Sequence, residues 1–521
     1  MPGQHDSSVT QTDGAAGLAA LDPRVPGLSV LHHPDLRRVG ERAPLLSLAA
    51  GGEALLSRRE PGFSVPGAAP GAAAPAQRRP LDHASLSRQP IRLRREGLGG
   101  VRLDACGSRT RVVVDGEPVT ARTFAAGELD QGVVLLLGRH VALLLHFVDP
   151  VTVPGLPRYG LIGESPAIVA LRLAIRKVAD VEVPVLVRGE TGSGKELAAR
   201  AIHQASRRRA GPFVAVNMAA VPATLAAAEL FGAVRGAYTG ADRPRQGLFV
   251  QAHGGTLFLD EIGATPPEVQ ALLLRALESR EVRPVGGEET RQVDVRVIAA
   301  TDADLEAAAH GERFRAPLLY RLASYELRVP PLRQRRDDVG RLLVYFLEQE
   351  LDAVGEQWRL ASPVPWLDGE LVARLAAYEW PGNVRQLHNV VRQLAIANRG
   401  ETRACLPETV GKLLATPAVA VSSAPPPRRR KPSEIGDDEL VELLRAHRFN
   451  LRGAAAALGI SRTSLYALVE QCPRLRKAAN LGREEIVAGL AAAGGDVDAA
   501  AAVLEVSSLG LKRRVRELGL A

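Results

Sequence analysis

Cysteines and aromatic residues are scarce in this sequence of 521 residues. The three cysteines, Cys106, Cys405 and Cys472, stand far apart, with no Cys-x-x-Cys pair and no metal-ligand spacing of cysteine and histidine. This pattern indicates neither a disulfide framework nor a zinc site, and it is typical of a reducing compartment. Aromatic residues make up 4% of the chain and hydrophobic residues 46%, which is the composition of a globular protein rich in small residues.

Long hydrophobic runs are absent as well. Arg139 and His140 interrupt the apolar stretch from 133 to 147, and no stretch reaches the about 18 apolar residues that a transmembrane helix needs. The first residues lack the basic and then apolar pattern of a signal peptide. We therefore expect a cytoplasmic protein with no membrane partner. The formal charge of +8 is spread over a chain long enough for about three or four domains, and it permits a nucleic-acid partner.

A glycine-rich turn from 189 to 196 is the most informative stretch. It follows the short apolar segment 183–188 and precedes the helix-period segment 197–203, so its glycines lie where a strand passes into a helix. Backbone N–H groups of such a turn can surround phosphate oxygens, because glycine has no Cβ, and a lysine can reach the outer phosphates. The turn predicts a nucleotide-binding loop made of Gly189, Glu190, Thr191, Gly192, Ser193, Gly194, Lys195 and Glu196.

Two acids close a buried-type strand about 65 residues further on, at Asp260 and Glu261. Together with the phosphate loop, these acids predict ATP hydrolysis. Asp260 would hold Mg²⁺ through its water shell, and Glu261 would be the base that orients the attacking water. Between the two motifs, the glycine-flanked segment 236–241 disfavours both helix and strand, and it is expected to be a mobile, exposed element.

The region from about 159 to 398 resembles the AAA+ core of the sigma-54-dependent transcription activators, or bacterial enhancer-binding proteins. The most specific match is Gly236-Ala-Tyr-Thr-Gly-Ala241, which is similar to the Gly-Ala-Phe-Thr-Gly-Ala loop of that family. Glu196 also agrees with the family, whose phosphate loop reads Gly-Lys-Glu. The resemblance implies contact with sigma-54 RNA polymerase through Gly236, Ala237, Tyr238, Thr239, Gly240 and Ala241.

Further site residues follow from the resemblance alone. Thr301 and Asp302 fall where the family has the Thr-Asn of its first sensor, and Asp302 is a departure, since a carboxylate cannot donate a hydrogen bond to phosphate. Pro317 replaces an acidic residue of the arginine-finger segment. The resemblance implies that Arg315 and Arg321 reach the ATP of a neighbouring subunit in a homo-oligomeric ring. It also implies that Arg385, in the Trp380-Pro-Gly-Asn-Val-Arg motif, contacts the nucleotide as second sensor.

Short apolar segments alternate with turn residues from about 44 to 153, which predicts a small β-sandwich. The order of features resembles a forkhead-associated domain, the sandwich that binds phosphothreonine. Thr110 replaces the asparagine of the family's last motif. The resemblance implies a phosphothreonine protein as partner, bound by Arg59, Ser87 and Arg88, because a guanidinium and a hydroxyl suit phosphate. The alternative is a sandwich that only packs on its neighbours.

An internal repeat follows a Pro-rich basic linker near the end of the chain. Matching positions lie 46 residues apart, as in Ile435 and Leu481 or Ile460 and Val506. The first unit predicts a helix-turn-helix and resembles the Fis-type module, which implies binding to double-stranded DNA at an upstream enhancer. The second unit has Glu505 at the turn and Gly510 within the expected helix, which favours a packing partner or a phosphate-only contact over sequence-specific DNA binding. The expected DNA-binding residues are Arg462, Thr463, Ser464 and Tyr466.

The sequence therefore predicts a multidomain protein with an N-terminal β-sandwich, a central α/β AAA+ P-loop ATPase with a helical lid, and a C-terminal all-α helix-turn-helix repeat. The expected segments are a flexible N-terminus 1–40, the sandwich 41–153, the α/β subdomain 159–325, the lid 326–400, the linker 415–433, and the two C-terminal units 434–475 and 480–521.

The expected function is ATP-driven activation of sigma-54 RNA polymerase, with ATP and Mg²⁺ bound. An alternative is a DNA-binding regulator whose AAA+ domain is only an oligomerisation scaffold, which Asp302 and Pro317 favour. A third interpretation, an unfoldase or protease subunit, is disfavoured because the sequence has no substrate-pore motif and ends in DNA-binding helices.

Overall fold

The computed structural model describes most of the chain up to residue 415 and a smaller part of the remaining residues. The described residues are 24–66, 78–97, 99–149, 155–237, 243–362, 365–415, 435–446, 458, 465, 468–469, 472, 475, 480–492, 500–501, 504, 506 and 508–518. They form two compact units, 1–418 and 419–521, which are described separately. No helix in the described part of the chain combines the length and the apolar character needed to cross a membrane.

Two antiparallel sheets form the N-terminal domain, here called the sandwich. One sheet has the order β2-β1-β10-β9-β6-β7 and the other β3-β4-β5-β8. In β4, Ile91 and Leu93 point inward while the arginines between and after them point outward, and apolar residues of both sheets share one core. The strands are β1 Val25–His32, β2 Arg42–Pro44, β3 Glu53–Leu56, β4 Ile91–Glu96, β5 Gly100–Asp104, β6 Val112–Val114, β7 Glu117–Val119, β8 Ala121–Phe124, β9 Val133–Leu137 and β10 Val141–Val148.

The prediction of a flexible N-terminus up to residue 40 is wrong from residue 25 onward, because β1 begins at Val25 and pairs with β10 from Val25 to His32, while residues 1–23 lie outside the described residues. Pro26 and Gly27 made this segment resemble a loop. Gly27 instead permits close packing, since a Cβ there would overlap the side chain of Val148. The glycine is thus a packing requirement of the strand.

A parallel sheet of order β12-β15-β18-β11-β19 forms the centre of the next domain, the α/β domain. Its residues alternate between two cores: Val185 and Val187 pack into one, and Leu186 between them packs into the other. Both faces are therefore covered by helices, as a parallel sheet requires. The strands are β11 Val185–Arg188, β12 Phe213–Asn217, β15 Thr256–Asp260, β18 Arg296–Thr301 and β19 Tyr325–Arg328, and the main helices are α3 Pro166–Ala179, α4 Lys195–Ala205, α5 Ala223–Phe231, α7 Pro267–Ser279 and α9 Ala316–Leu322.

Shorter elements complete the α/β domain. They are α6 Leu248–Gln251, α8 Leu305–His310, and the two-residue strand pairs β13 Gly232–Ala233 with β14 Arg245–Gln246 and β16 Glu281–Val282 with β17 Arg291–Gln292. The predicted domain boundary between 325 and 326 is wrong, because it falls inside β19, which pairs with β11.

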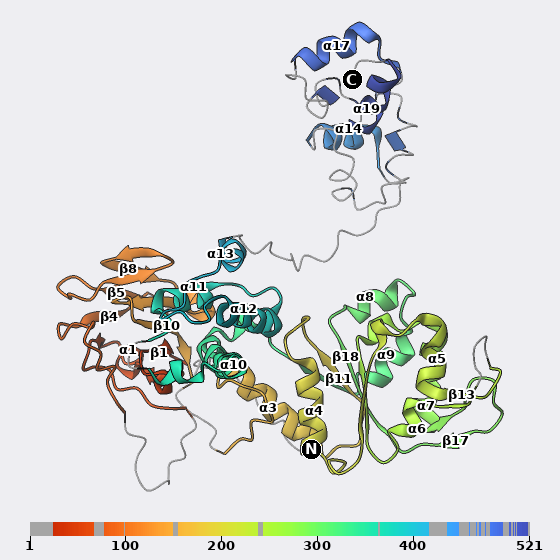
Figure 1. Ribbon diagram of the computed structural model, residues 1–521, viewed down its shortest axis with the longest axis horizontal. Helices are drawn as coiled ribbons and strands as arrows, with labels where there is room; N and C mark the ends of the chain where they lie inside the picture. Colours follow the sequence, from red (N-terminus) through yellow and green to blue (C-terminus); the bar gives the residue numbers. More distant parts are fainter. Residues whose placement is uncertain are drawn as a thin grey trace, which may run out of the picture. The chain divides into compact units, whose positions relative to one another are not determined.

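The lid follows as a helical domain and lies between the sandwich and the α/β domain (Figure 1). Its helices are α10 Val339–Ala353, α11 Gly369–Ala377, α12 Asn383–Ala397 and α13 Glu408–Ala415. The predicted end of the lid at 400 is too early, since Val410 and Leu414 of α13 pack into the lid core.

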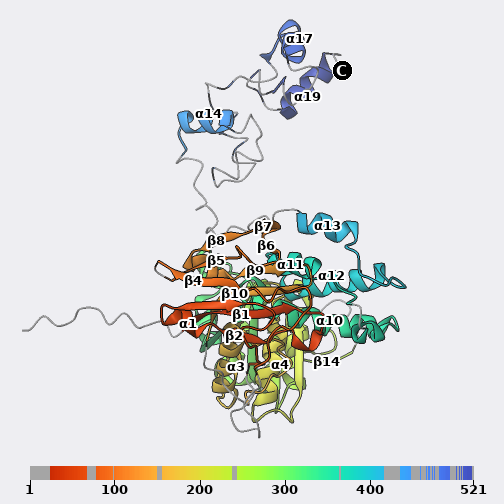
Figure 2. The same cartoon turned by 90° about the vertical axis from the view of Figure 1, so that its left-hand side faces the viewer.

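The sandwich and the lid share a hydrophobic core, and the two views of Figures 1 and 2 place β1, β9 and β10 beside the lid helices. Leu135 and Leu143 face the interior of the sandwich, whereas Val134 and Leu144 pack with lid residues such as Leu371. Strands β9 and β10 are thus buried on both faces, which explains why their sequence is a continuous apolar run rather than an alternating one.

The C-terminal unit contains the helices α14 Asp437–Ala446, α17 Arg483–Ala492 and α19 Ser508–Glu517. Two separate small cores contain residues at equivalent positions of the repeat, such as Leu440 and Ile486, or Leu465 and Leu511. The expected interruption at Gly510 is wrong, because α19 continues through this residue. The predicted DNA-binding residues Arg462, Thr463, Ser464 and Tyr466 lie outside the described residues.

Candidate nucleotide site

The glycine-rich loop connects the carboxyl end of β11 to the start of α4. Gly192 and Gly194 have φ angles of +77° and +111°, which favour glycine. A Cβ at Gly189 would lie 2.9 Å from Ser193 Oγ and 3.0 Å from the carbonyl oxygen of Val329. The loop therefore needs glycine for backbone conformation at two positions and for space at the third.

Lys195 is buried at the base of this loop. Its Nζ donates to the carbonyl oxygen of Gly189 at 3.0 Å and lies 3.4 Å from Oε1 of Glu261. Ser193 Oγ is buried in the same loop and has no hydrogen-bond partner in the structure. A buried ammonium and an unpaired hydroxyl beside glycines fit a ligand with anionic oxygens, such as a nucleotide phosphate.

The two predicted acids lie at the carboxyl end of β15, with Asp260 as its last residue and Glu261 directly after it. Asp260 accepts a 3.3 Å hydrogen bond on Oδ2 from Asn217, while its buried Oδ1 has no partner in the structure. Glu261 has a left-handed backbone with φ of +52°. An unpaired carboxylate oxygen beside a phosphate loop fits a magnesium ion, which prefers oxygen ligands and keeps several waters.

Asp302 lies close to both motifs. The hydroxyl of Thr191 donates to Oδ2 of Asp302 at 2.6 Å. Burial raises the pKa of the Glu261 carboxyl above its ordinary value, the charges of Asp302 and Asp260 raise it further, and Lys195 opposes them. Burial opposes ionisation of Asp302 too, but the Thr191 hydroxyl and Lys195 hold its pKa below the ordinary value. Asp302 is thus the carboxylate that ionises more readily than Glu261.

Thr301, the other residue of the predicted first sensor, is buried at the end of β18. Its Oγ1 accepts a 3.0 Å hydrogen bond from the backbone N–H of Ala303. This contact turns the chain after β18 and positions Asp302 beside the loop.

The lid reaches the phosphate loop through Glu190. Both carboxylate oxygens of Glu190 accept from Arg333, at 2.8 and 2.5 Å. Asn383 is fully buried, and its Nδ2 donates to Glu190 and to the carbonyl oxygen of Thr191, both at 3.1 Å. Its Oδ1 accepts from the N–H of Leu332 at 2.8 Å. Asn383 therefore joins two lid segments to the loop.

The start of α12 also contacts the phosphate loop. The N–H of Arg385 donates to the carbonyl oxygen of Gly192 at 3.3 Å, and a Cβ at Gly192 would lie 2.5 Å from the carbonyl oxygen of Gly382. The buried Arg335 donates from Nη2 to the carbonyl oxygen of Ser193 at 3.2 Å. The predicted second sensor, Arg385, thus begins a helix that touches the loop through its backbone.

The two predicted finger arginines are held on α7. The N–H of Arg315 donates to the side-chain oxygen of Gln270 at 2.8 Å, and the guanidinium of Arg321 donates to the carbonyl oxygen of Leu277 at 3.2 Å. Pro317 lies in the first turn of α9, where a missing N–H removes no helical hydrogen bond. The replacement of an acid by Pro317 is therefore compatible with the helix.

Glu196 lies on the exposed side of α4. Its carboxylate accepts from Arg200, one turn later, at 3.0 and 2.8 Å. This is an ordinary ion pair of the type that stabilises an exposed helix face.

The base of the loop at 236–241 is anchored by backbone pairing. The N–H of Val234 donates to the carbonyl oxygen of Val285 at 3.1 Å, and Ala237 packs against Gly286. Gly236 and Ala237 belong to the described residues, whereas Tyr238, Thr239, Gly240 and Ala241 lie outside them.

The three predicted phosphopeptide residues lie on two adjoining loops of the sandwich. The N–H of Arg58 donates to the carbonyl oxygen of Ser87 at 3.0 Å, which brings the exposed Arg59 and Arg88 to the same end of the domain. Thr110 Oγ1 accepts from the N–H of Ser87 at 2.7 Å. The residue at the asparagine position therefore supports the serine loop.

The sequence motifs alone did not predict a function for several lid residues at this site. Arg333 and Arg335 belong to the motif Pro330-Pro-Leu-Arg-Gln-Arg335, and Asn383 to the motif that supplies Arg385. One sequence feature points to Asn383, namely an asparagine directly after Pro-Gly. Asparagine tolerates the left-handed backbone that this residue adopts, with φ of +53°. Its contacts with residues nearly two hundred positions away are visible only in the fold.

Comparisons with known proteins agree with this geometry. Residues 161–328 match the family model described as "Sigma-54 interaction domain", and residues 333–411 match "AAA+ ATPase lid domain". The C4-dicarboxylate transport transcriptional regulatory protein DctD of Rhizobium meliloti (strain 1021) is 43% identical over 313 residues, which cover 60% of this chain and 63% of that protein. The transcriptional regulatory protein ZraR of Klebsiella oxytoca is 41% identical over 332 residues, which cover 61% of this chain and 70% of that protein.

A solved structure of NtrX from Brucella abortus in complex with ATP is 31% identical with a TM-score of 0.43, covering 60% of this chain and 69% of that one. The chain spans about half to two thirds of the length of the first curated relatives it matches. On its match to ZraR and to both family models, the chain belongs to the family of transcriptional regulators that carry a sigma-54 interaction domain.

Proposed function

We propose that this protein is a DNA-bound ATPase that activates transcription by remodelling sigma-54 RNA polymerase. The observation that carries the proposal is the convergence of Lys195, Asp260 and Glu261 at one edge of the parallel sheet, next to a phosphate-type loop that the lid contacts. Family membership supplies the partner, because the matching domain is one that interacts with sigma-54.

In the proposed reaction, the loop and Lys195 bind the phosphates of ATP and offset their charge. Glu261 orients the attacking water and accepts its proton, and a pKa raised by burial makes this carboxylate a stronger base than an ordinary glutamate. Asp260 would hold Mg²⁺, which would neutralise charge on the phosphate oxygens. Arg385, at the start of the lid helix, is the proposed second sensor of the bound nucleotide.

The fingers are proposed to act across a subunit interface. Arg315 and Arg321 are exposed; the backbone N–H of Arg315 and the guanidinium of Arg321 donate to residues of α7. An arginine that completes the site of the next subunit would make hydrolysis depend on a homo-oligomeric ring. The segment 236–241 would then transmit the state of the nucleotide to sigma-54.

DNA binding and phosphothreonine recognition complete the proposal. The repeated core positions of the C-terminal unit support two similar modules, of which the first would bind enhancer DNA through Arg462, Thr463, Ser464 and Tyr466. The proximity of the Arg58–Arg59 and Ser87–Arg88 loops supports a phosphate site on the sandwich. A phosphothreonine protein bound there would regulate the core.

One observation favours the second candidate, a scaffold without remodelling activity. Asp302 presents an acceptor where the family has an amide donor, and it adds negative charge beside Glu261. A scaffold would bind DNA and assemble without turning over ATP. An ATPase measurement on the purified protein separates the two candidates, because the scaffold would show no turnover.

Separation of function tests the main proposal. Thr239→Ala should keep ATPase activity and lose open-complex formation in a reconstituted sigma-54 transcription assay, whereas Lys195→Ala should lose both. Thr409→Ala makes the same exchange at an exposed position of α13, outside this loop, and should keep both activities. Activation by Thr239→Ala equal to that of the parent would overturn the proposed role of the loop.

A further inference from the structure

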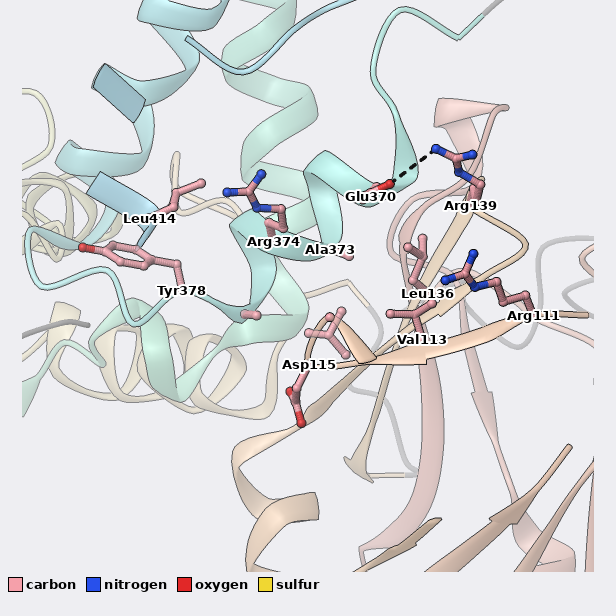
Figure 3. A pocket seen from close by; sticks show the side chains of 13 residues that line it. Arg111, Val113, Asp115, Leu136, Arg139, Glu370, Ala373, Arg374, Tyr378 and Leu414 are labelled. Atoms are coloured by element: carbon pink, nitrogen blue, oxygen red, sulfur yellow. Dashed lines mark ion pairs between the residues drawn. The ribbon is translucent and has the colours of Figure 1, made fainter. Parts of the chain in front are cut away.

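A cavity of about 720 Å³ lies where the sandwich meets the lid. One wall comes from the sandwich, with Val113 and Leu136, and the other comes from the lid, with Ala373 and Tyr378 (Figure 3). Val134 of β9 also lines the cavity. The residues that line it include none of the phosphate loop and neither Asp260 nor Glu261. Its size lies within the about 300–1,000 Å³ of small-molecule sites.

Three arginines stand around the apolar walls of this cavity, which we call the interdomain cavity. Figure 3 shows Arg111 and Arg139 on the sandwich and Arg374 on the lid. Arg139 lies 3.8 Å from Glu370, and both side chains are more than half exposed, so this ion pair is weak. The structure thus places cationic groups from both domains beside one apolar surface.

The carboxylates that line the cavity do not neutralise the positive charge of these arginines. Asp115 is engaged by Arg122 at 2.8 Å, and Glu370 is the acid beside Arg139. Among the described residues, no carboxylate forms an ion pair with Arg111 or Arg374. The sequence that follows α13 supplies no further carboxylate, since residues 416–433 contain no Asp or Glu and include four consecutive basic residues.

We propose that the interdomain cavity binds a small organic anion with an apolar body, and that the ligand bridges the sandwich and the lid. The carboxylate, sulfonate or phosphate of such a molecule would pair with Arg111 and Arg374, which come from opposite walls. Its apolar body would cover Val134, Leu136 and Tyr378. A ligand needs both parts to contact the whole lining. An inorganic anion would leave the apolar wall exposed to water, and a neutral apolar molecule would leave the arginines without a counterion.

The lid helix at this cavity continues toward the nucleotide site. Arg374 and Tyr378 lie on and just after α11, and the chain then turns through Trp380 to Asn383, which holds Glu190 of the phosphate loop. The ligand would therefore stabilise the packing of a helix whose continuation contacts the nucleotide loop. This makes the cavity suited to an effector rather than to a substrate.

Fluorescence titration of the full chain with 1-anilinonaphthalene-8-sulfonate tests the proposal, with excess ATP and Mg²⁺ present to occupy the nucleotide site. This probe joins an aromatic body to a sulfonate. We expect saturable binding that weakens about tenfold or more in Arg111→Gln/Arg374→Gln, because two charge-assisted hydrogen bonds are lost. N-phenyl-1-naphthylamine, which has the same body without the sulfonate, should bind the parent about tenfold more weakly.

Matched variants locate the bound probe. Arg102→Gln/Arg176→Gln removes the same charge from exposed positions outside the cavity, on β5 and α3, and should bind like the parent. Ala373→Phe fills the cavity and should abolish the saturable component. Absence of saturable binding to the parent, equal binding by Arg111→Gln/Arg374→Gln, or equal binding of the uncharged probe would each overturn the proposal. Since Arg111 and Arg374 are exposed, their replacement remains informative even where Ala373→Phe fails to fold.

Discussion

Arg42 of the sandwich lies with its Nη2 2.5 Å from Oδ2 of Asp337 in the segment that leads into the lid, and both side chains are buried. The same Nη2 donates to the carbonyl oxygen of Glu164, just before α3 of the α/β domain, at 2.7 Å. The neighbouring carboxylate of Asp338 accepts from the N–H groups of Glu164 and Ser165 at 2.6 and 3.0 Å. Three domains therefore meet at one buried polar cluster.

Replacement of Arg42 by Met should loosen this junction. The change leaves Asp337 buried without its cation, and breaking a buried ion pair in this way costs about 3–5 kcal/mol. Limited proteolysis and hydrogen exchange should show faster opening of β2 and of the segment that precedes α10. The double variant Arg42→Met/Asp337→Leu is the control, because it removes both charges and should recover part of the loss. Strictly additive effects of the two changes would contradict the pairing.

Replacement of Asp302 by Asn should raise ATPase turnover. The amide can donate to a phosphate oxygen or to water, and a hydrogen bond to a charged group is worth about 1.5–3 kcal/mol, or roughly tenfold or more in rate. Removing the Asp302 charge also lowers the pKa of Glu261, so the acid limb of the pH profile should move to lower pH. Initial rates of phosphate release measured across pH check both effects. Asp352→Asn, on the exposed side of α10, should change neither, and an unchanged acid limb in Asp302→Asn would refute the coupling.

Replacement of Asn383 by Ala should weaken nucleotide binding without touching the nucleotide loop itself. The change leaves the carbonyl oxygen of Thr191 and the N–H of Leu332 without partners and removes one donor from Glu190, which keeps Arg333, at a cost of about 1–3 kcal/mol. Affinity for a fluorescent ATP analogue should fall by about tenfold. The exposed Asn389, one and a half turns further along α12, provides the control Asn389→Ala. Equal affinities of the two variants would show that Asn383 does not connect the lid to the loop.

The sandwich should lose stability as the pH falls below about 6.5. Burial, helped by the charge of Arg42, lowers the pKa of His146 to about 3, and burial together with His33 lowers that of His32 to about 4. Between these values and 6.5 the unfolded chain binds protons that the folded chain refuses. The free energy of unfolding should therefore fall with decreasing pH by about 1.4 kcal/mol per unit for each histidine.

Thermal denaturation from pH 7.5 to 4.5 measures this slope. His146→Gln keeps a polar partner for Ser29, which shares a 2.7 Å hydrogen bond with His146. This variant should reduce the slope of the free energy of unfolding against pH by the contribution of one histidine. His310→Gln replaces an exposed histidine and should leave the slope unchanged. A slope that is the same in all three proteins would exclude His146 as a contributor.

Local motifs of the nucleotide site were predictable from the sequence, because a strand, a glycine turn and a helix follow one another directly from 183 to 203. The lid contacts were not. The ion pair of Glu190 with Arg333 joins residues 143 positions apart, and neither residue type is unusual in its own segment. The Pro-Gly-Asn turn was noted, but the role of Asn383 depends on how far the lid folds back.

The start of the sandwich shows a different limit. Pro26 and Gly27 are turn residues by composition, yet they lie within β1, and Gly27 is there because the neighbouring strand leaves no room for a Cβ. Tertiary crowding of this kind has no signature in a single segment. Likewise, the apolar run of β9 and β10 indicated strands but not what covers their outer face.

The covering of that outer face bears on how the protein unfolds. Val134 and Leu144 contribute to the same core as Leu371 and other lid residues, so separation of the sandwich from the lid would expose a continuous apolar surface on each. Exposure of this apolar surface to water costs free energy, and this cost couples the unfolding of the two domains. The sandwich and the lid are therefore expected to melt in a single cooperative transition, and a shortened chain that begins after residue 153 would be prone to aggregate through its uncovered lid helices.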